Sequence, residues 1–322
     1  MRKITKTLLG IGGAFCLIGA LLFIIGFTSG GTKYVHDTNL NSMNAQEDNK
    51  ESANRFTLKK TEIPDFTSLN INLEDSDLNI EESPNEKSYI EYVQATKDKK
   101  NPLSYSIENG TLTLKEAGNT GASYYYINVD ISFLQAALSS KNIEDYTKES
   151  SKYENYVTLY LPKDKLVSSA KIYLGYGDFY IKNAAFDTIN IKLDDGDFNA
   201  NTFTANSGKL TFSYGDCDLQ KASLGNISLT SKDGDLTVNE LTLSGKTKIA
   251  LSYGDAEITL NDSTKKVSGF DLATHYGTIT ASGLNGNKTL DEDDDINTFQ
   301  SDSKDGKTKL AIDSKDGDIT LK

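Results

Sequence analysis

The chain has 322 residues, of which 37% are hydrophobic and 25% are charged, and its formal net charge is −12. A chain of this length can bury a sizeable core. The acidic balance, with no basic stripe in the sequence, argues against nucleic acid as a partner, because that binding depends on cations that neutralise phosphates.

The composition also argues against the common catalytic arrangements. His36 and His275 are the only histidines, so a His-based metal cluster or a Ser-His-Asp triad lacks its parts. Arg2 and Arg55 are the only arginines, and neither lies in the repeats described below. We therefore expect a protein that is not an enzyme and that has no cofactor, apart from the Ca²⁺ considered below.

The N-terminus predicts a membrane anchor. Arg2, Lys3 and Lys6 precede Leu8 to Phe27, a run of 20 residues without a charge, which is long enough to span the hydrocarbon core of a bilayer. The run exceeds the apolar stretch of a typical cleaved signal peptide. We expect a cytoplasmic tail at 1–7, an uncleaved transmembrane signal anchor at 8–27 and a single-pass protein of the cell membrane. The positive N-terminal flank places the rest of the chain outside the cytoplasm.

Residues 28–55 are rich in Thr, Ser, Gly, Asn and acidic residues and have few apolar groups. Such a composition cannot build a core and is typical of a flexible stalk.

The rest of the chain carries an internal repeat built around glycine. The first five of its seven glycines are each followed by Asp and are spaced 19, 19, 19 and 20 residues apart. The turn glycines are Gly177, Gly196, Gly215, Gly234, Gly254, Gly277 and Gly317. A fixed period of this size predicts coils that stack and share one core.

Apolar residues alternate on both sides of each glycine. The positions two and four residues after each glycine are all apolar, as in Phe198 and Ala200 after Gly196, and so is the position five residues before it, as in Ile191. Each unit therefore reads as strand, Gly turn, strand with inward side chains at period two. A sharp turn of this kind favours Gly, which tolerates positive φ. Cys217 takes an inward position and is expected to be a small core residue.

A related segment lies far upstream. Phe66 to Ile80 lines up with Phe186 to Ala200, with Ser76 in place of the turn glycine. We therefore expect a first solenoid coil at 56–80, a β-rich excursion at 81–156 and β-solenoid repeats at 157–322.

Taken together, a Val/Leu-rich strand that ends in Leu161-Pro162, followed by serial strand, Tyr-Gly-Asp or Asp-Gly-Asp, strand units, resembles the β-strand-repeat "putative adhesin" family of bacterial cell-envelope proteins, a domain of unknown function. The resemblance covers roughly residues 63 to 322. It implies an all-β, right-handed β-helix-like or β-solenoid fold displayed outside the membrane. It brings no set of catalytic residues.

The aspartates that follow the turns are candidate metal ligands. With one coil of about 19 residues they form a column at about the 4.8 Å strand spacing, and like charges that close need relief. Backbone N–H groups of the turns supply that relief, or Ca²⁺ does, since it binds several carboxylate oxygens. We favour the backbone. The candidates are Asp178, Asp197, Asp216, Asp235 and Asp255.

Tyrosines are candidate binding residues. The residue before the turn glycine alternates as Tyr176, Asp195, Tyr214, Asp233 and Tyr253. Either one column interleaves Tyr with Asp, or the physical coil has about 38 residues and the two types lie on different edges. A Tyr edge offers sugar rings an apolar face and a hydroxyl. Tyr124 and Tyr126 in the excursion are further candidates.

These features favour a membrane-anchored, extracytoplasmic binding, adhesin-like or scaffold module of the cell envelope. Its partners would be a cell-wall polymer, a surface glycan or a membrane protein. Leu8 to Phe27 would anchor the protein in the membrane. An accessory subunit of a membrane envelope-stress signalling system is the alternative. A polysaccharide lyase or hydrolase is less favoured, because the repeats lack Arg and no pair of Asp residues stands out.

Overall fold

The computed structural model describes residues 54–96, 101–116, 155–291 and 295–322, and Arg55–Lys322 form one compact unit. The predicted tail, anchor and most of the stalk lie outside the described residues, as do Tyr124 and Tyr126. Among the described residues, no helix has the length and apolar character that crossing a membrane requires.

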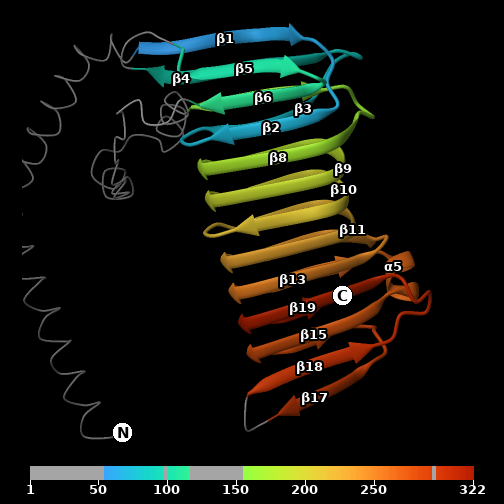
Figure 1. The fold of residues 1–322 in the computed structure, drawn as a ribbon. Helices are drawn as coiled ribbons and strands as arrows, with labels where there is room; N and C mark the ends of the chain where they lie inside the picture. Colours follow the sequence, from blue (N-terminus) through green and yellow to red (C-terminus); the bar gives the residue numbers. More distant parts are fainter. Residues whose placement is uncertain (1–53, 97–100, 117–154, 292–294) are drawn as a thin grey trace, which may run out of the picture. The chain divides into compact units, whose positions relative to one another are not determined.

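The described part of the chain is almost entirely β-structure (Figure 1). Its one helix within these residues is the short α5 (Asp262–Val267). The strands are β1 (Asn54–Ile63), β2 (Ser68–Leu73), β3 (Asp77–Glu82), β4 (Ser88–Thr96), β5 (Leu103–Glu108), β6 (Thr111–Glu116), β7 (Tyr156–Leu161), β8 (Leu166–Tyr176), β9 (Phe179–Asp195), β10 (Phe198–Phe212), β11 (Cys217–Asp233), β12 (Leu236–Leu243), β13 (Lys246–Tyr253), β14 (Ala256–Leu260), β15 (Gly269–Tyr276), β16 (Ile279–Ala281), β17 (Asn287–Asp291), β18 (Ile296–Ser301), β19 (Lys309–Asp316) and β20 (Ile319–Leu321).

The strands stack in parallel with a register of one repeat. Phe198 of β10 lies beside Phe179 of β9 on one side and beside Cys217 of β11 on the other, and Cys217 lies beside Leu236 of β12. One physical coil is therefore one 19-residue repeat, and the alternative of a 38-residue coil is excluded. The all-β, solenoid-like repeat fold is confirmed, while the right-handed sense of the coil stays a prediction.

Each coil has three segments whose alternate side chains point into the core. In β9 the spacing of buried side chains is two residues within a segment and three between segments, so the alternation changes phase twice along one strand. The buried residues of β9 are Phe179, Ile181, Ala184, Phe186, Ile189, Ile191 and Leu193. The first and last segments match the predicted pattern, and the middle pair adds a third side. Cys217 is buried, as its inward position predicts.

The C-terminal coil does not stack in chain order. Strand β19 lies between β13 and β15, parallel to both, and β20 lies in the same way between β14 and β16. The last coil of the sequence is thus inserted between two coils that precede it. Beyond β15, the antiparallel strands β18 and β17 close this end of the stack, which covers the open edge of the array.

A similar insertion occurs at the N-terminal end. Strand β2 lies between β6 and β8, and β3 lies between β7 and β9. Strand β6, which the sequence places in the excursion, therefore stacks in the array as part of a further coil. Strands β4 and β5 then pair antiparallel to β7 and β6, so both ends of the solenoid finish in antiparallel strands.

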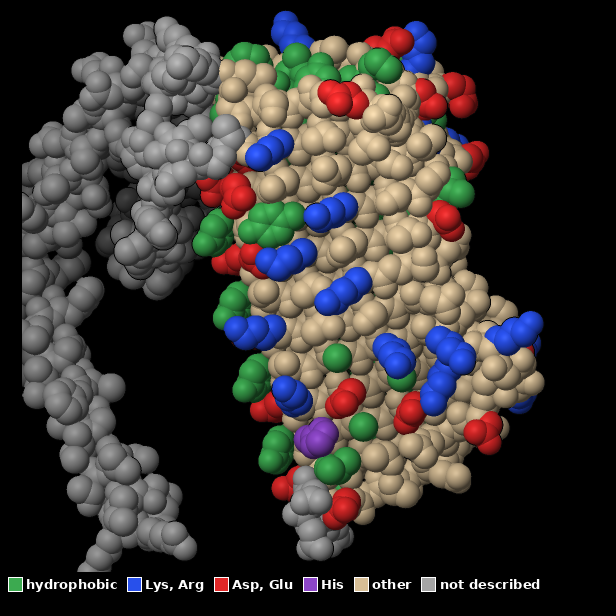
Figure 2. All heavy atoms as spheres, viewed as in Figure 1, with side chains coloured by type: hydrophobic (Ala, Val, Ile, Leu, Met, Phe, Trp, Pro, Cys, Tyr) green, Lys and Arg blue, Asp and Glu red, His purple; other side chains and the backbone are tan. Residues whose placement is uncertain are grey.

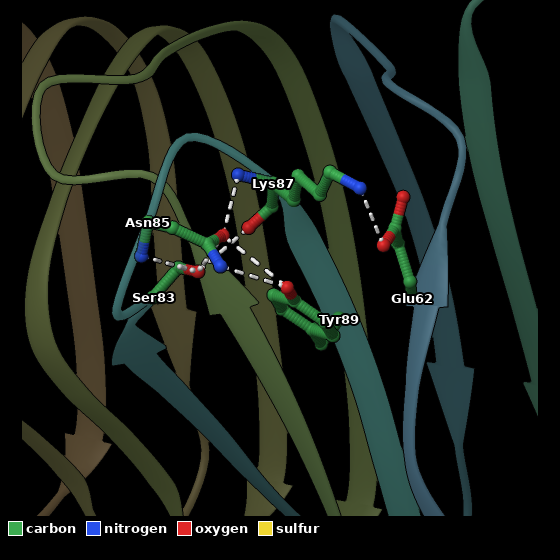
Figure 3. Close-up of polar contacts among 5 residues, drawn as sticks. All are labelled: Glu62, Ser83, Asn85, Lys87 and Tyr89. Carbon is green, nitrogen blue, oxygen red and sulfur yellow. Dashed lines mark hydrogen bonds and ion pairs between the residues drawn. The ribbon is translucent and has the colours of Figure 1, made fainter.

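The connection between β3 and β4 is fixed by side chains (Figure 3). The Asn85 side chain accepts a hydrogen bond from Lys87 N at 2.9 Å and donates one to the Tyr89 hydroxyl at 2.9 Å. Ser83 Oγ donates to the Lys87 carbonyl at 2.6 Å. The Lys87 ammonium lies 2.8 Å from a carboxylate oxygen of Glu62 on β1. These hydrogen bonds fix the turn itself, and the exposed ion pair links it to β1, which pairs with β4.

The repeat turn at Ser76, where serine replaces the turn glycine, uses a buried carboxylate instead. Ser76 is fully buried, and its hydroxyl donates to Glu116 Oε1 at 3.0 Å and accepts from Gln94 Nε2 at 2.8 Å. Glu116 Oε2 accepts from the backbone N–H groups of Glu74 and Asp75. Burial raises the pKa of Glu116, and these hydrogen bonds oppose the rise. Glu116 comes from the neighbouring coil, so the turn is satisfied across the stack.

The repeated glycines are required by two constraints at once. Five of the seven turn glycines have positive φ, from +118° at Gly215 to +145° at Gly317. A Cβ built on Gly215 would also collide with the backbone carbonyl of Gly196 in the adjacent coil. Gly177 and Gly277 are not among those with positive φ, and at these two positions the close approach to a neighbouring carbonyl is the constraint.

We expect Gly215→Ala to lower the free energy of unfolding by about 3 kcal/mol, because strained φ and a backbone clash add together. Gly306→Ala is the matched control: its φ is +68° and no atom lies within 4 Å of the added Cβ, so a cost of about 1 kcal/mol is expected. Chemical denaturation of both variants checks this. Equal losses would show that φ alone, and not the approach of the coils, selects glycine.

Candidate functional site

The residues that precede the turn glycines form one column across the stack. In spatial order the register gives Tyr176, Asp195, Tyr214, Asp233, Tyr253, Asp316 and Tyr276, with Asp195, Tyr214 and Asp233 joined through the backbone bonds of the turn glycines between them. Tyr and Asp thus alternate without interruption. We call this column the Tyr/Asp ridge.

The tyrosines of the ridge are unusually exposed for large side chains. Their exposed fractions are 65% at Tyr176, 47% at Tyr214, 58% at Tyr253 and 67% at Tyr276. Figure 2 shows green side chains spaced down the left edge of this face, with red or blue side chains between them, where β8, β13, β19 and β15 end in Figure 1. Because each tyrosine is two coils from the next, their spacing is about 9.6 Å, twice the strand separation.

A shallow cavity lies between two tyrosines of the ridge. Its volume is about 330 Å³, and it is lined by Tyr176, Asp194, Asp195, Ser213, Tyr214 and Lys232. Lys232 Nζ lies 3.1 Å from the Tyr214 hydroxyl and 5.0 Å from the centre of its ring. The cation therefore contacts the aromatic ring, which holds Tyr214 at the side of the cavity.

Asp194 beside the cavity is held ionised by its neighbours. Its carboxylate accepts from Lys192 Nζ and from the Tyr173 hydroxyl, each at 2.9 Å. Partial desolvation works against ionisation, but these hydrogen bonds outweigh it and lower the pKa of Asp194. In return, desolvation and the Asp194 carboxylate raise the pKa of Tyr173 to about 12.

The aspartates that follow the turns form a second column, parallel to the ridge. Each Oδ1 accepts a hydrogen bond from the backbone N–H of the next coil, as in Asp235 N to Asp216 Oδ1 at 2.8 Å. In spatial order this Asp ladder runs through Asp77, Asp178, Asp197, Asp216, Asp235, Asp255 and Asp318 and ends at the N–H of Thr278.

The ladder shows how closely spaced carboxylates are tolerated. Every carboxylate in it faces a backbone donor, which is the relief favoured above. Within the described residues no cluster of three or more His, Cys, Asp or Glu is arranged to hold a metal ion. Asp178, Asp197, Asp216, Asp235 and Asp255 thus all lie in one column, and each accepts a hydrogen bond from a turn N–H.

Two members of the ridge were missed from the sequence. Tyr276 and Asp316 precede Gly277 and Gly317, so the same signal marks them. Their spacing breaks the 19-residue period, because the C-terminal coil is inserted out of order. His275, which precedes Tyr276, lies 4.0 Å from Asp313 and is 44% exposed.

These features define a β-solenoid-like repeat protein whose coils are closed by glycine turns and bordered by an exposed Tyr/Asp ridge. The chain belongs to the Toastrack DUF4097 family, whose model matches residues 66–322. The family resemblance inferred from the repeats is confirmed. No curated protein matches the chain.

Several solved structures are similar to the chain. One is a "putative adhesin" from Parabacteroides distasonis, with 10% identity, a TM-score of 0.41 and coverage of 84% of this chain and 98% of that one. Another is a "putative cell adhesion protein" from Clostridium sporogenes, with 14% identity, a TM-score of 0.34 and coverage of 83% of this chain and 97% of that one. A third is a "putative lipid binding protein" from Parabacteroides distasonis, with 12% identity, a TM-score of 0.33 and coverage of 84% of this chain and 98% of that one. Function has to be inferred from this chain's own residues.

We expect Asp216→Ala to lower the free energy of unfolding by about 1 to 2 kcal/mol, because it leaves the Asp235 N–H without its acceptor. Asp218→Ala removes an exposed carboxylate from the adjacent strand and should change the value by less than about 0.5 kcal/mol. The free energies of unfolding of the wild type and of both variants are measured by chemical denaturation, once with a chelator and once with millimolar Ca²⁺. A Ca²⁺-dependent gain seen in the wild type and absent from D216A would contradict a purely structural ladder.

Proposed function

We propose that the protein is a non-catalytic binding module of the cell envelope and that the Tyr/Asp ridge is its binding surface for glycan. The observation that carries the proposal is the column of four exposed tyrosines at a two-coil spacing. Single exposed apolar side chains are common, but a group of them at one place marks an interaction surface. Here four of them lie in register on one edge.

The chemistry of the ridge suits sugar rings. A tyrosine presents an apolar face on which the C–H side of a sugar can lie, and the intervening Asp195, Asp233 and Asp316 offer acceptors for sugar hydroxyls. The spacing of about 9.6 Å between tyrosines is comparable to the length of two linked sugar rings. A linear glycan laid along the stack would meet the same contacts at every second coil.

Placement at the cell envelope rests on the N-terminus. The cations at Arg2, Lys3 and Lys6 and the uncharged run from Leu8 to Phe27 support a single-pass anchor that holds the solenoid outside the cytoplasm. In that position the ridge would face the wall polymers and glycans of the envelope.

A binding role also agrees with the carboxylates that lie beside the ridge. The carboxylates of the ladder are occupied by turn N–H groups, and Asp194 is engaged by Lys192 and Tyr173. A general acid or nucleophile needs a carboxyl group poised for proton transfer or attack. The ridge instead repeats one weak contact many times, which is how multivalent binding builds affinity.

The test is co-sedimentation of the full-length chain, in a non-ionic detergent, with isolated cell-wall sacculi. We expect saturable binding by the wild type and about a hundredfold loss of affinity in Y176A/Y214A/Y253A, if each stacked ring contributes about 1 kcal/mol. Y176F/Y214F/Y253F keeps the rings and is the matched control, with most of the binding retained.

Equal loss in the Phe and Ala variants would show that the hydroxyls and not the ring faces bind. Failure of the wild type to bind sacculi, with or without Ca²⁺, would count against the wall glycan. Crosslinking in the membrane would then test a protein partner, as the accessory-subunit alternative requires. Binding restored only by Ca²⁺ would give the Asp ladder a bridging role.

A further inference from the structure

The face beside the Tyr/Asp ridge is cationic, although the chain as a whole is acidic. This face is made of three columns of residues that lie in register from coil to coil. In β8 the three columns begin with Lys171, Tyr173 and Gly175, which are alternate residues of the strand. Over the five coil segments from β8 to β13 these columns hold five lysines and one carboxylate, that of Asp194. The lysines are Lys171, Lys192, Lys209, Lys232 and Lys248.

Three of these lysines share one column. Lys171 lies beside Asn190, Asn190 beside Lys209, Lys209 beside Ser228, and Ser228 beside Lys248. We call Lys171, Lys209 and Lys248 the Lys column. Its lysines recur at every second coil, about 9.6 Å apart, in the same coils that carry Tyr176, Tyr214 and Tyr253. Figure 2 views this face, with blue side chains across its middle.

The charges of the Lys column are not neutralised within the part of the chain that the structure describes. Each of the three side chains is exposed, and none forms an ion pair with another described residue, whereas Lys192 is taken up by Asp194. At a separation close to the Debye length at ordinary ionic strength, the three ammonium groups still repel one another weakly. An anionic ligand would relieve that repulsion.

The surroundings of the Lys column favour a thin ligand. On one side lie Asp195 and Asp233 of the ridge, and on the other Asp187 at the corner of the coil is exposed and bonded to Asn206. A wide anionic surface, such as a bilayer, would meet these carboxylates together with the lysines. A single extended chain can follow the column and avoid them.

We propose that the Lys column binds a linear anionic polysaccharide that carries one negative group for every two sugar rings and lies along the stacking axis. The match between a two-coil spacing of lysines and a two-ring spacing of charge selects this class. The binding goes beyond the glycan contact of the ridge, because it uses different residues on a different surface and depends on charge. The sequence hides it, since net charge averages over all faces of the coil.

The test uses the full-length chain in a non-ionic detergent and fluorescently labelled hyaluronan oligosaccharide, a linear polymer with one carboxylate per two rings. We expect K171Q/K209Q/K248Q to weaken binding at least tenfold. K182Q/K221Q/K266Q removes the same charge from lysines outside the face and should stay within twofold of the wild type. Raising the salt concentration should weaken wild-type binding more than that of the first variant, because salt screens the ion pairs.

Carboxyl-reduced hyaluronan is the probe that separates the two surfaces. If the Lys column acts as proposed, the wild type binds it at least tenfold more weakly than the acidic polymer. Equal binding of the two polymers, or equal losses in the two lysine variants, would overturn the proposal. Binding that depends on Tyr176, Tyr214 and Tyr253 and not on the lysines would overturn the role of the Lys column but support glycan binding by the ridge. Tighter, lysine-dependent binding of single-stranded DNA or of anionic vesicles would overturn the assignment to a polysaccharide.

Discussion

The close approach of successive backbones at the glycine turn is the constraint on which the rest of the structure depends. The turn glycines face the carbonyl of the neighbouring coil where a Cβ would collide, and the following aspartate N–H is bonded to the carboxylate of the previous coil. Both interactions demand that coils stack in exact one-repeat register. That register aligns the tyrosines, the ladder aspartates and the lysines into straight columns.

Much of this could be predicted from the sequence, because the period, the turn glycines and the alternation of apolar residues are all local signals. The phase changes near Lys182 and Asp187 could not, since a corner leaves no sharp mark in a run of strand-forming residues. The insertion of β19 and β20 also escaped, because pairings across 63 residues, as between Asp318 and Asp255, leave no trace in spacing. The same limit hid Tyr276 and Asp316.

The candidate surfaces illustrate a second limit. Net charge correctly describes the whole chain as acidic, yet the ladder carboxylates gather at the turns and five lysines gather on the face beside the ridge. The absence of a basic stripe along the sequence therefore did not mean its absence in space. Residues that are 38 or 39 positions apart, such as Lys171, Lys209 and Lys248, become neighbours in a column only when the coil length is known.

Because of the inserted C-terminal coil, Tyr and Asp alternate along the ridge in spatial order and not only in the order of the repeats along the sequence. If the coils stacked in chain order, the coil that ends in Tyr276 would follow the coil that ends in Tyr253, and two tyrosines would be adjacent. Instead β19 separates them and places Asp316 between. The two-coil rhythm of Tyr and Asp is thus continued by a segment that comes from elsewhere in the sequence. A ligand that repeats at the same interval gives that continuity a physical reason.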